Sequence, residues 1–363
     1  MTKAKPTLEE FAESEAQARF RENQELARSA RAARAQVREQ TAELASLREQ
    51  LGVYHALEDA RLAPPVWLAP REPRAGHAAI PSLVITDWHW GEVVRPEEVD
   101  GINAYTVAIA EQRMRRAFEG AVTLCRDYLK GVTYEGFQVF LGGDLISGQP
   151  HAEIRETNEQ TVAESVVSIV EPLEAGLNLL AKEFGRVHVT GVPGNHPRNT
   201  PKQIAKRRAA DNFDTLIYRL LARDYRKHPK ITVDASEALD ARVTLYQTRY
   251  LLTHGSDFSG GSGISGALAP LLLGAHRTTR QQAAAGQPYD VMVLGHFHQA
   301  IFYPSKGIIV SGCGIGYNEF AHAHKFEPEP PQCAMWLTTP ERGITISTPV
   351  FVADPVAEGW KAP

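Results

Sequence analysis

Aspartate, asparagine and histidine side chains stand in five short groups along the chain, and each group closely follows a run of apolar residues. The groups are Asp87 with His89, Asp144, Asn195 with His196, His254, and His296 with His298. Carboxylate, amide and imidazole groups together are typical ligands of divalent transition metals, whereas Mg²⁺ and Ca²⁺ prefer oxygen ligands alone. One such group is common in ordinary polar loops, but five in succession predict a metal centre.

The number of these side chains predicts two metal ions rather than one. Two Asp, one Asn and four His remain as ligands when His196 is set aside. Two ions about 3.5–4 Å apart need one carboxylate that bridges them, with further ligands on each side. The mixture of nitrogen and oxygen donors favours Mn, with Fe and Zn as alternatives. Such a pair polarises a phosphoryl oxygen and lowers the pKa of a bound water, so that hydroxide is available as a nucleophile.

The apolar runs before the five groups indicate strands that are buried on both faces of an α/β sheet, because they are rich in Val, Leu, Ile and Phe. Run and polar tip together occupy 82–89, 137–144, 187–196, 250–255 and 290–298. Functional side chains gather at the carboxyl ends of the strands in such sheets, so we expect the five tips to meet there. Glycines beside four of the tips allow the backbone to turn tightly.

Helical segments separate these strands. Three segments have helical composition and pattern: 103–130, 153–184 and 201–225. Asn103 is the candidate cap of the first of them. Strands that alternate with helices indicate β-α-β units and a mainly parallel sheet. The pattern changes after His298, where three further strands predict a second sheet; they are 308–312, 333–339 and 344–352.

The composition of the N-terminal segment predicts that residues 1–63 form a helical arm. Residues 7–62 are rich in Ala, Glu, Arg, Gln and Leu, and as one helix they would reach roughly 80 Å. Most positions of a heptad frame are apolar; the frame is Asn23, Leu26, Ala30, Ala33, Val37, Gln40, Leu44, Leu47, Leu51 and Tyr54. This pattern indicates a coiled coil through which copies of the chain associate, and a helical hairpin folded on the main domain is the alternative. A proline-rich linker, 64–81, leads to the main domain, 82–363.

The composition of the 363-residue chain is that of an ordinary soluble protein, with 43% apolar residues and a net charge of −4. Without a strongly basic balance, any nucleic-acid binding must rely on local patches. The three cysteines lack C-x-x-C spacing, which argues against a disulfide framework and suits a reducing cytoplasm. No apolar run is long enough for a membrane span or a signal segment, so we expect a cytoplasmic protein without membrane contact.

The order of the tips over residues 82–298 resembles the motifs of the calcineurin-like metallophosphoesterase superfamily. This order is D-x-H, G-G-D, G-N-H, H-G and G-H-x-H. The resemblance implies a four-layer α/β/β/α sandwich with a dinuclear metal centre. It assigns the first ion to Asp87, His89 and His298, the second to Asn195, His254 and His296, and the bridge to Asp144. It places His196 beside the leaving group, as a general acid or transition-state stabiliser, while metal-bound hydroxide attacks phosphorus in line.

Two features depart from the pattern of this superfamily. Many members have Asp or Glu after the G-N-H histidine, but here Pro197 follows, so no partner that orients His196 is visible in the sequence. After Asp144 the chain continues Leu-Ile-Ser-Gly instead of the V-D-R-G of Ser/Thr protein phosphatases, whose phosphate-binding arginine is therefore missing. The stretch G-G-D-L-I-S is closer to the G-G-D-L-F of SbcD-type DNA-repair nucleases.

Basic residues that follow the G-N-H group suggest how a substrate is held. If a helix begins near Pro201, Lys202 and Lys206 share one face of it and Arg198 stands at its entry. This basic segment would guide a polyphosphate backbone to the metals. A solvated helix face is the alternative interpretation.

Three aromatic residues near the tips are candidates for stacking on a nucleobase. Trp88 and Trp90 flank His89, but they follow a buried strand, so core packing is the better interpretation of both. Tyr317 lies in a glycine-rich stretch after the last tip.

The sequence therefore favours a phosphodiesterase or nuclease that acts on DNA or RNA with two divalent metal ions. A phosphomonoesterase that acts on a protein or a small molecule is the alternative, and the missing V-D-R-G disfavours it. A non-catalytic structural subunit is a third interpretation, which the complete set of ligand types disfavours.

Overall fold

The structure is a computed structural model that describes residues 8–59, 77–148, 152–235, 237–259 and 268–353. The chain divides into two compact units, Met1–Glu72 and Pro73–Pro363. Most of the predicted proline-rich linker, 64–76, lies outside the described residues. Among the helices that are described, none has both the length and the apolar character needed to cross a membrane.

The described part of the first unit is a single helix, α1, which runs without interruption from Leu8 to Asp59. The predicted N-terminal helix is thereby confirmed, and a hairpin bend between Leu8 and Asp59 is excluded, while packing of this helix on the main domain stays an untested alternative. Ala, Glu, Arg, Gln and Leu are strong helix formers, so the composition itself explains the length. Four apolar heptad positions have side chains that are each more than half exposed; they are Leu26, Val37, Leu44 and Leu47. Pairing of this seam with a second helix stays a prediction.

Strands and helices alternate along the second unit. The strands are β1 (His77–Ile85), β2 (Val132–Tyr134), β3 (Phe137–Leu141), β4 (Val187–Gly191), β5 (Ile231–Asp234), β6 (Asp240–Leu245), β7 (Thr248–Thr253), β8 (Val291–Leu294), β9 (Ile301–Tyr303), β10 (Ile308–Val310), β11 (Gln332–Thr339) and β12 (Gly343–Phe351). The helices are α2 (Val107–Thr123), α3 (Ala152–Thr157), α4 (Val162–Phe184), α5 (Phe213–Asp224), α6 (Leu268–Ala284) and α7 (Glu319–Ala323). All five strands predicted before the polar tips are confirmed, as β1, β3, β4, β7 and β8.

The strands form two sheets. In the first the order is β12-β11-β1-β3-β4-β5, with β2 beside β1, and in the second it is β6-β7-β8-β10-β9. Neighbours from β1 to β5 are parallel, as predicted, while β11 and β12 pair antiparallel at the other edge. A second sheet is confirmed, but its membership differs from the prediction. Of the three strands predicted to build it, only β10 does so, and β11 and β12 extend the first sheet.

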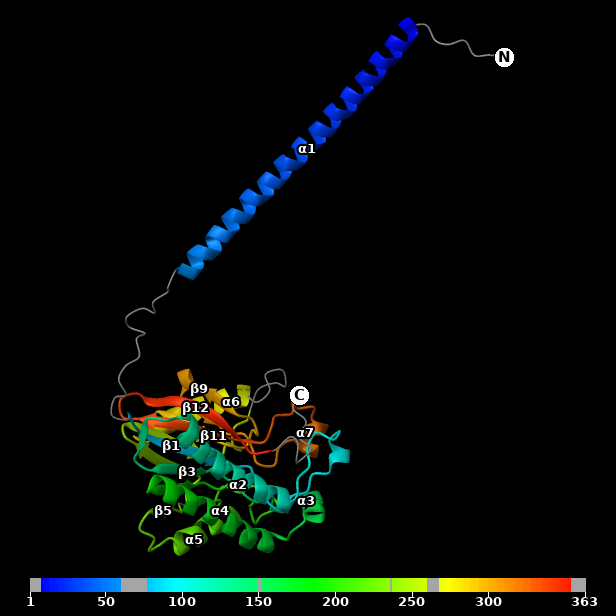
Figure 1. Ribbon diagram of the computed structural model, residues 1–363. Coiled ribbons are helices and arrows are strands. Elements are labelled where there is room, and N and C mark those ends of the chain that lie inside the picture. The colour runs from blue at the N-terminus through cyan, green and yellow to red at the C-terminus, as the bar shows by residue number, and fades with distance from the viewer. Residues whose placement is uncertain (1–7, 60–76, 149–151, 236, 260–267, 354–363) are drawn as a thin grey trace. The chain divides into compact units, whose positions relative to one another are not determined.

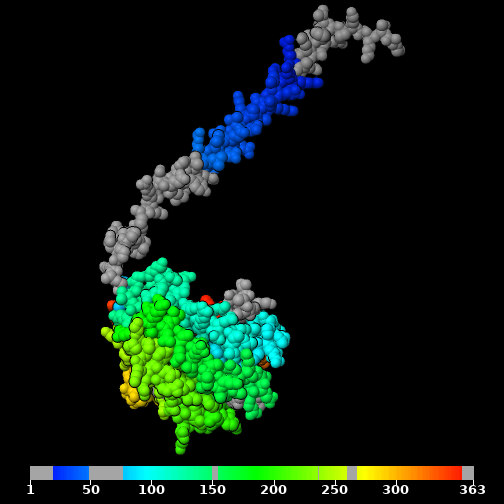
Figure 2. Space-filling view, turned by 60° about the horizontal axis from the view of Figure 1, so that its bottom comes forward, coloured from blue at the N-terminus to red at the C-terminus, as the bar shows by residue number. Residues whose placement is uncertain are grey.

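The two sheets pack face to face between two layers of helices (Figure 1). Along β1, Ile85 belongs to the core beneath α2, α4 and α5, whereas Val84 belongs to the core between the sheets. Along β7, Leu252 faces the core between the sheets and Leu251 packs in the core beneath α6. Figure 2 shows the face covered by the green helices α4 and α5. This alternation of faces confirms the α/β/β/α sandwich.

Helix α2 begins later than predicted. It starts at Val107 and is capped by Thr106, whose hydroxyl accepts a hydrogen bond from the backbone N–H of Ile109. Asn103, the predicted cap, is buried, and its side-chain amide donates to the Ile315 carbonyl. Asn103 therefore anchors a distant loop and does not start the helix.

The other two predicted helices also have different bounds. Segment 153–184 forms two helices, α3 and α4. Thr161 caps the start of α4 with a capping box, so α4 begins as a new helix after α3 has ended. Residues 201–212 are not helical, and α5 begins at Phe213 behind its cap Asn212. The predicted face shared by Lys202 and Lys206 is therefore wrong.

The main domain begins before the predicted boundary at Ser82, because β1 starts at His77. The linker prediction is thus wrong for residues 77–81. The pairing of β1 with β2 ends at Ala79 and its pairing with β3 begins at Ser82. Pro81 stands in the gap between these two ladders, where a residue without an N–H is tolerated.

Candidate metal centre

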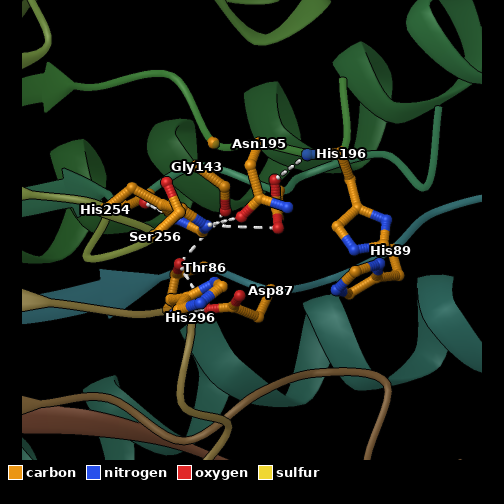
Figure 3. A network of polar contacts seen from close by, with 12 residues as sticks. Thr86, Asp87, His89, Gly143, Asn195, His196, His254, Ser256 and His296 are labelled. Atoms are coloured by element: carbon orange, nitrogen blue, oxygen red, sulfur yellow. Dashed lines mark hydrogen bonds and ion pairs between the residues drawn. The ribbon is translucent and has the colours of Figure 1, made fainter. Parts of the chain in front are cut away.

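The carboxyl ends of the five predicted strands meet at one edge of the sandwich. The register aligns Ile85, Leu141 and Gly191, the last residues of β1, β3 and β4. In the second sheet, Leu252 of β7 pairs with Val293 of β8. All the predicted ligand side chains, together with His196, follow these ends and come together from both sheets. Figure 3 labels Asp87, His89, Asn195, His196, His254 and His296 among them. That they bind metal ions stays a prediction.

Asp87, His89 and His298 form the first group of candidate ligands. The Nε2 atoms of His89 and His298 are 3.3 Å apart, and His298 Nε2 lies 3.3 Å from Asp87 Oδ1. The other carboxylate oxygen of Asp87 accepts from the Thr86 hydroxyl and from the His296 backbone N–H. Apart from its contact with His298, Asp87 Oδ1 is buried without a hydrogen-bond partner among the described residues. Donor atoms that converge around an unsatisfied carboxylate oxygen fit a cation.

Asp144, Asn195, His254 and His296 form the second group. His254 Nε2 lies 3.2 Å from Asp144 Oδ2 and 3.0 Å from Asn195 Oδ1. The other ring nitrogen of His254 lies 2.8 Å from the Gly142 carbonyl, which can only accept a hydrogen bond. Nδ1 therefore carries a proton, and in the neutral ring Nε2 presents a lone pair to the group.

Asp144 connects the two groups. It lies with His254 and His296 in one set of mutually close donor atoms, and with His89 and His196 in another. In each set the donor atoms are all within 4.8 Å of one another. Asp144 thus lies close to His89 of the first group and to His254 and His296 of the second, which is where a bridging ligand must lie.

The backbone of the centre is strained. Nine described residues other than glycine have positive φ, and five of them are predicted ligands: Asp87, His89, Asp144, His296 and His298. Their φ values lie between 50° and 66°, in the left-handed region that non-glycine residues rarely adopt. Such residues cluster at functional sites, where the surrounding structure holds them in place. The crowding is visible at Gly194, where an added Cβ would lie 2.0 Å from Asp144 Oδ1.

The carboxylates and imidazoles shift one another's pKa values. Burial raises the pKa of Asp87, but the hydrogen bond and charge of His298 outweigh it and lower the pKa to about 2. Burial lowers the pKa of His254, but the charge and hydrogen bond of Asp144 outweigh it and raise the pKa to about 9. A protonated imidazole therefore lies beside a carboxylate, which is the charge arrangement that a bound cation would replace.

His196, the predicted general acid, lies against His89. Their ring centroids are 4.5 Å apart in an edge-on arrangement, and the His196 backbone N–H donates to Asp144 Oδ1. Burial lowers the pKa of His196 to about 4, so its ring is neutral at pH 7. Its Nδ1 atom is buried without a hydrogen-bond partner among the described residues. A neutral ring suits hydrogen-bond donation to a developing charge better than release of a proton.

Asp214 is a buried residue of the centre that the motifs do not reveal. Its Oδ2 accepts from the backbone N–H groups of Asp144 and Gly194, at 2.8 and 2.9 Å, and its Oδ1 accepts from Leu145 N–H at 3.1 Å. The carboxylate thus ties the loop after β3 to the loop after β4. A signal was present: Asn212 followed by an acid two residues later is typical of a helix start.

Glu92 is a second carboxylate outside the motifs. Its Oε2 lies 3.4 Å from His89 Nδ1 and accepts from the Ser147 hydroxyl at 2.8 Å. Burial raises the pKa of Glu92, but the hydrogen bond and charge of His89 outweigh it and lower the pKa to about 2. A carboxylate behind a ligating imidazole orients the ring and increases its basicity. The three-residue spacing from His89 is the signal that points to Glu92.

The basic residues predicted to bind phosphate have different surroundings. The Arg198 guanidinium donates to the backbone carbonyls of Asn195 and Thr200, so it holds the shape of its own loop. Lys202 and Lys206 are exposed in the irregular segment before α5. The structure therefore brings only Arg198 into contact with a predicted ligand residue.

None of the three aromatic residues proposed for stacking is accessible. Trp88 and Trp90 are buried, as core packing predicts, and the Trp88 indole N–H donates to the Ala110 carbonyl. Tyr317 is only 7% exposed. A nucleobase must be bound by other side chains.

Comparisons with known proteins give structural matches only. No protein-family model and no curated protein matches the chain. The chain is similar to Vps29 from Entamoeba histolytica complexed with Zn²⁺, at 12% identity, over 74% of this chain and 99% of that one, with a TM-score of 0.28. It is also similar to a predicted phosphoesterase from Streptococcus pneumoniae (13% identity, 75% and 97% covered, TM-score 0.25) and to a dimetal phosphatase from Danio rerio (11%, 76% and 99%, 0.33). TM-scores this low do not support a functional assignment, so the functional proposal rests on the geometry of the candidate metal centre. The likeness to SbcD-type nucleases stays a prediction.

Proposed function

We propose that this protein is a phosphoesterase that depends on two divalent metal ions. In this proposal Asp144 is shared, and the remaining ligands divide into Asp87, His89 and His298 for one ion and Asn195, His254 and His296 for the other. The observation that carries the proposal is the place of Asp144 in both sets of converging donor atoms. Mixed nitrogen and oxygen donors favour Mn, with Fe and Zn as alternatives.

The chain's own residues prepare the centre for this chemistry. Bound there, two divalent cations polarise a phosphoryl oxygen and lower the pKa of a coordinated water. The Gly142 carbonyl fixes the tautomer of His254, and Glu92 lies behind His89. The neutral ring of His196 lies beside both groups, where it can donate a hydrogen bond to the leaving oxygen.

For the substrate we propose a phosphodiester of DNA or RNA. Lys202 and Lys206 are exposed and have no acidic partner among the described residues. Their segment adjoins the centre, because Arg198 at its start donates to the Asn195 carbonyl. Exposed cations beside a phosphoester site attract a phosphate backbone in a salt-dependent way. A phosphomonoesterase is the alternative, which the missing V-D-R-G sequence disfavours.

Hydrolysis with Mn²⁺ tests the proposal on labelled single-stranded DNA, bis-p-nitrophenyl phosphate and p-nitrophenyl phosphate. Wild type is compared with Asp144→Ala and with Asp290→Asn, a control that removes an exposed ion pair with Arg249 at the start of β8. We expect cleavage of the DNA and of the diester by wild type and the control, and loss in Asp144→Ala and in EDTA. Activity on the monoester alone would refute the diesterase assignment, and activity that survives in Asp144→Ala would refute the shared ligand.

A further inference from the structure

An exposed cluster of aromatic rings lies in and directly after helix α7. Phe320 is 62% and Phe326 is 53% exposed, and the exposed ring of His324 lies between them in the chain. The ring centroids of Phe320 and His324 are 4.1 Å apart, and that of Phe326 is 5.8 Å from His324 and 6.1 Å from Phe320. Single exposed aromatic residues are ordinary, but these three rings lie close together and form one continuous aromatic surface, in which the Phe320 and Phe326 rings are inclined at 70° and the His324 ring at about 35° to each.

The local fold builds this cluster. Asn318 caps α7 by accepting a hydrogen bond from Ala321 N–H, which fixes the start of the helix. His324 N–H and the His324 side chain both bond to the Phe320 carbonyl, so the two rings are held on one side of the turn. Lys325 has a φ of 58°, and Phe326 N–H then donates back to the Ala321 carbonyl. The left-handed residue thus returns Phe326 to the other two rings.

The segment that carries the cluster is joined to the metal centre. Upstream, Gly314 N–H donates to the backbone carbonyl of Asp87 at 3.1 Å. The side-chain amide of Asn318, the cap of α7, lies 3.4 Å from Glu92 Oε1. Glu92 in turn lies 3.4 Å from His89 Nδ1. One continuous path of contacts therefore leads from the first ligand group to the aromatic cluster.

We propose that Phe320, His324 and Phe326 form a stacking surface for the bases of single-stranded nucleic acid whose phosphodiester lies at the metal centre. The inference rests on the proposed function and specifies its substrate. The two acidic neighbours Glu319 and Glu327 outnumber Lys325, the one exposed cation within the described residues 319–327, so the surface does not attract phosphates and the contact is with the bases. Every base offers a π-face, and stacking on aromatic side chains needs no particular sequence.

The test compares two short fluorescent oligonucleotides with the same phosphates, one of thymidines and one made of abasic sites. Binding is followed by fluorescence anisotropy in EDTA, and cleavage is followed in Mn²⁺. We expect wild type to prefer the thymidine oligonucleotide, and Phe320→Ala with Phe326→Ala to weaken that preference by about 5- to 150-fold. Tyr128→Ala is the matched control, because this ring is 75% exposed and follows α2, far along the chain from the polar tips.

Thermal unfolding confirms that the double variant is folded. Wild type without a preference for bases, wild type that binds and cleaves neither oligonucleotide, or a preference that the double variant keeps, would each overturn the stacking surface. Hydrolysis of bis-p-nitrophenyl phosphate reports on the proposed function separately. If the base preference is present and lost in the double variant while no phosphoester is hydrolysed, the stacking surface stands and the proposed function fails.

Discussion

Replacement of Asp214 by Asn should loosen the two loops that carry Asp144 and Asn195. The carboxylate is fully buried and accepts three backbone N–H groups from these loops. An asparagine oxygen in the place of Oδ2 keeps two of these bonds. The amide NH₂ then faces the N–H of Leu145, so that two donors oppose each other without an acceptor.

The magnitude follows from these contacts. Loss of one hydrogen bond to a charged acceptor costs about 1.5–3 kcal/mol, and a buried donor left without a partner costs about 1–3 kcal/mol. Part of this is offset, because burial and the charge of Asp144 raise the pKa of Asp214 to about 7, so removal of the charge relieves repulsion. We therefore expect Asp214→Asn to lower the free energy of unfolding by about 2–4 kcal/mol, which corresponds to a Tm lower by roughly 5–10 °C.

The more specific effect is on metal binding. Variants of residues that orient ligands typically lose about 10- to 100-fold in metal affinity, and we expect this range for Mn²⁺ by isothermal titration calorimetry. Asp211→Asn is the matched control, because the one side-chain hydrogen bond that this nearby carboxylate accepts among the described residues comes from Asn199 at an exposed position. An Asp214→Asn protein with a lower Tm but wild-type metal affinity would refute the positioning argument. An unchanged Tm would refute the hydrogen-bond argument.

Three further predictions concern protons, packing and association. Metal affinity should rise with pH until about 9, because Asp144 keeps His254 protonated in the metal-free protein below that pH and a ligating imidazole must lose this proton. Calorimetry in buffers of different ionisation enthalpy measures the proton release. The same raised pKa stabilises the metal-free fold below about 6.5, and this contribution is lost as the pH rises through about 9, which thermal unfolding in EDTA measures. Gly194→Ala should abolish Mn²⁺-dependent hydrolysis, because the new Cβ would lie 2.0 Å from the carboxylate of Asp144. Leu44→Asp with Leu47→Asp should convert an oligomer into a monomer in analytical ultracentrifugation, because both residues are exposed on the heptad seam of α1.

Each of these predictions has a contrasting outcome. Metal affinity that is constant across the pH range would show that His254 binds no proton in the metal-free protein. Gly185→Ala is the control: it introduces a side chain at positive φ, unlike Gly194→Ala, but no heavy atom lies within 4 Å of the new Cβ, so it should cost stability and leave hydrolysis intact. Ser46→Asp, between the two leucines but off the seam, should leave the oligomer unchanged. A wild-type monomer would rule out the coiled coil.

The strands and their polar tips were predictable because both are encoded by consecutive residues. A continuous apolar run predicts a buried strand, and the Gly and ligand residue that follow it predict the turn. The neighbour of a strand cannot be predicted in this way. β11 contains the buried apolar run 333–337, much as β8 consists of Val291–Leu294, yet β11 joins the first sheet and pairs antiparallel with β1. Long-range pairing therefore decided what the sequence left open, namely which sheet each late strand extends.

The residues that support the ligands were harder to find. Asp214 lies in a stretch whose lysines and arginines suggest a solvated helix, and only the start of α5 at Phe213 makes the acid a buried one. A helix start at Asn212 was readable from its capping pattern, and it would have excluded the helix from Pro201. Glu92 is three residues from His89, a local signal, but its other contact is with Ser147 in the loop after β3, and nothing local to Glu92 predicts that contact.

The division of the metal centre between two sheets has a consequence for how the protein matures. Asp87 and Asp144 belong to loops of the first sheet, whereas His254, His296 and His298 belong to loops of the second. During synthesis the first ligand group lacks His298 until more than two hundred residues after Asp87 have been made. If these groups bind metal ions as proposed, a nascent chain offers no complete site until the two sheets have docked. The proposed function therefore predicts that metal loading is a late step of folding and that it stabilises the contact between the two sheets.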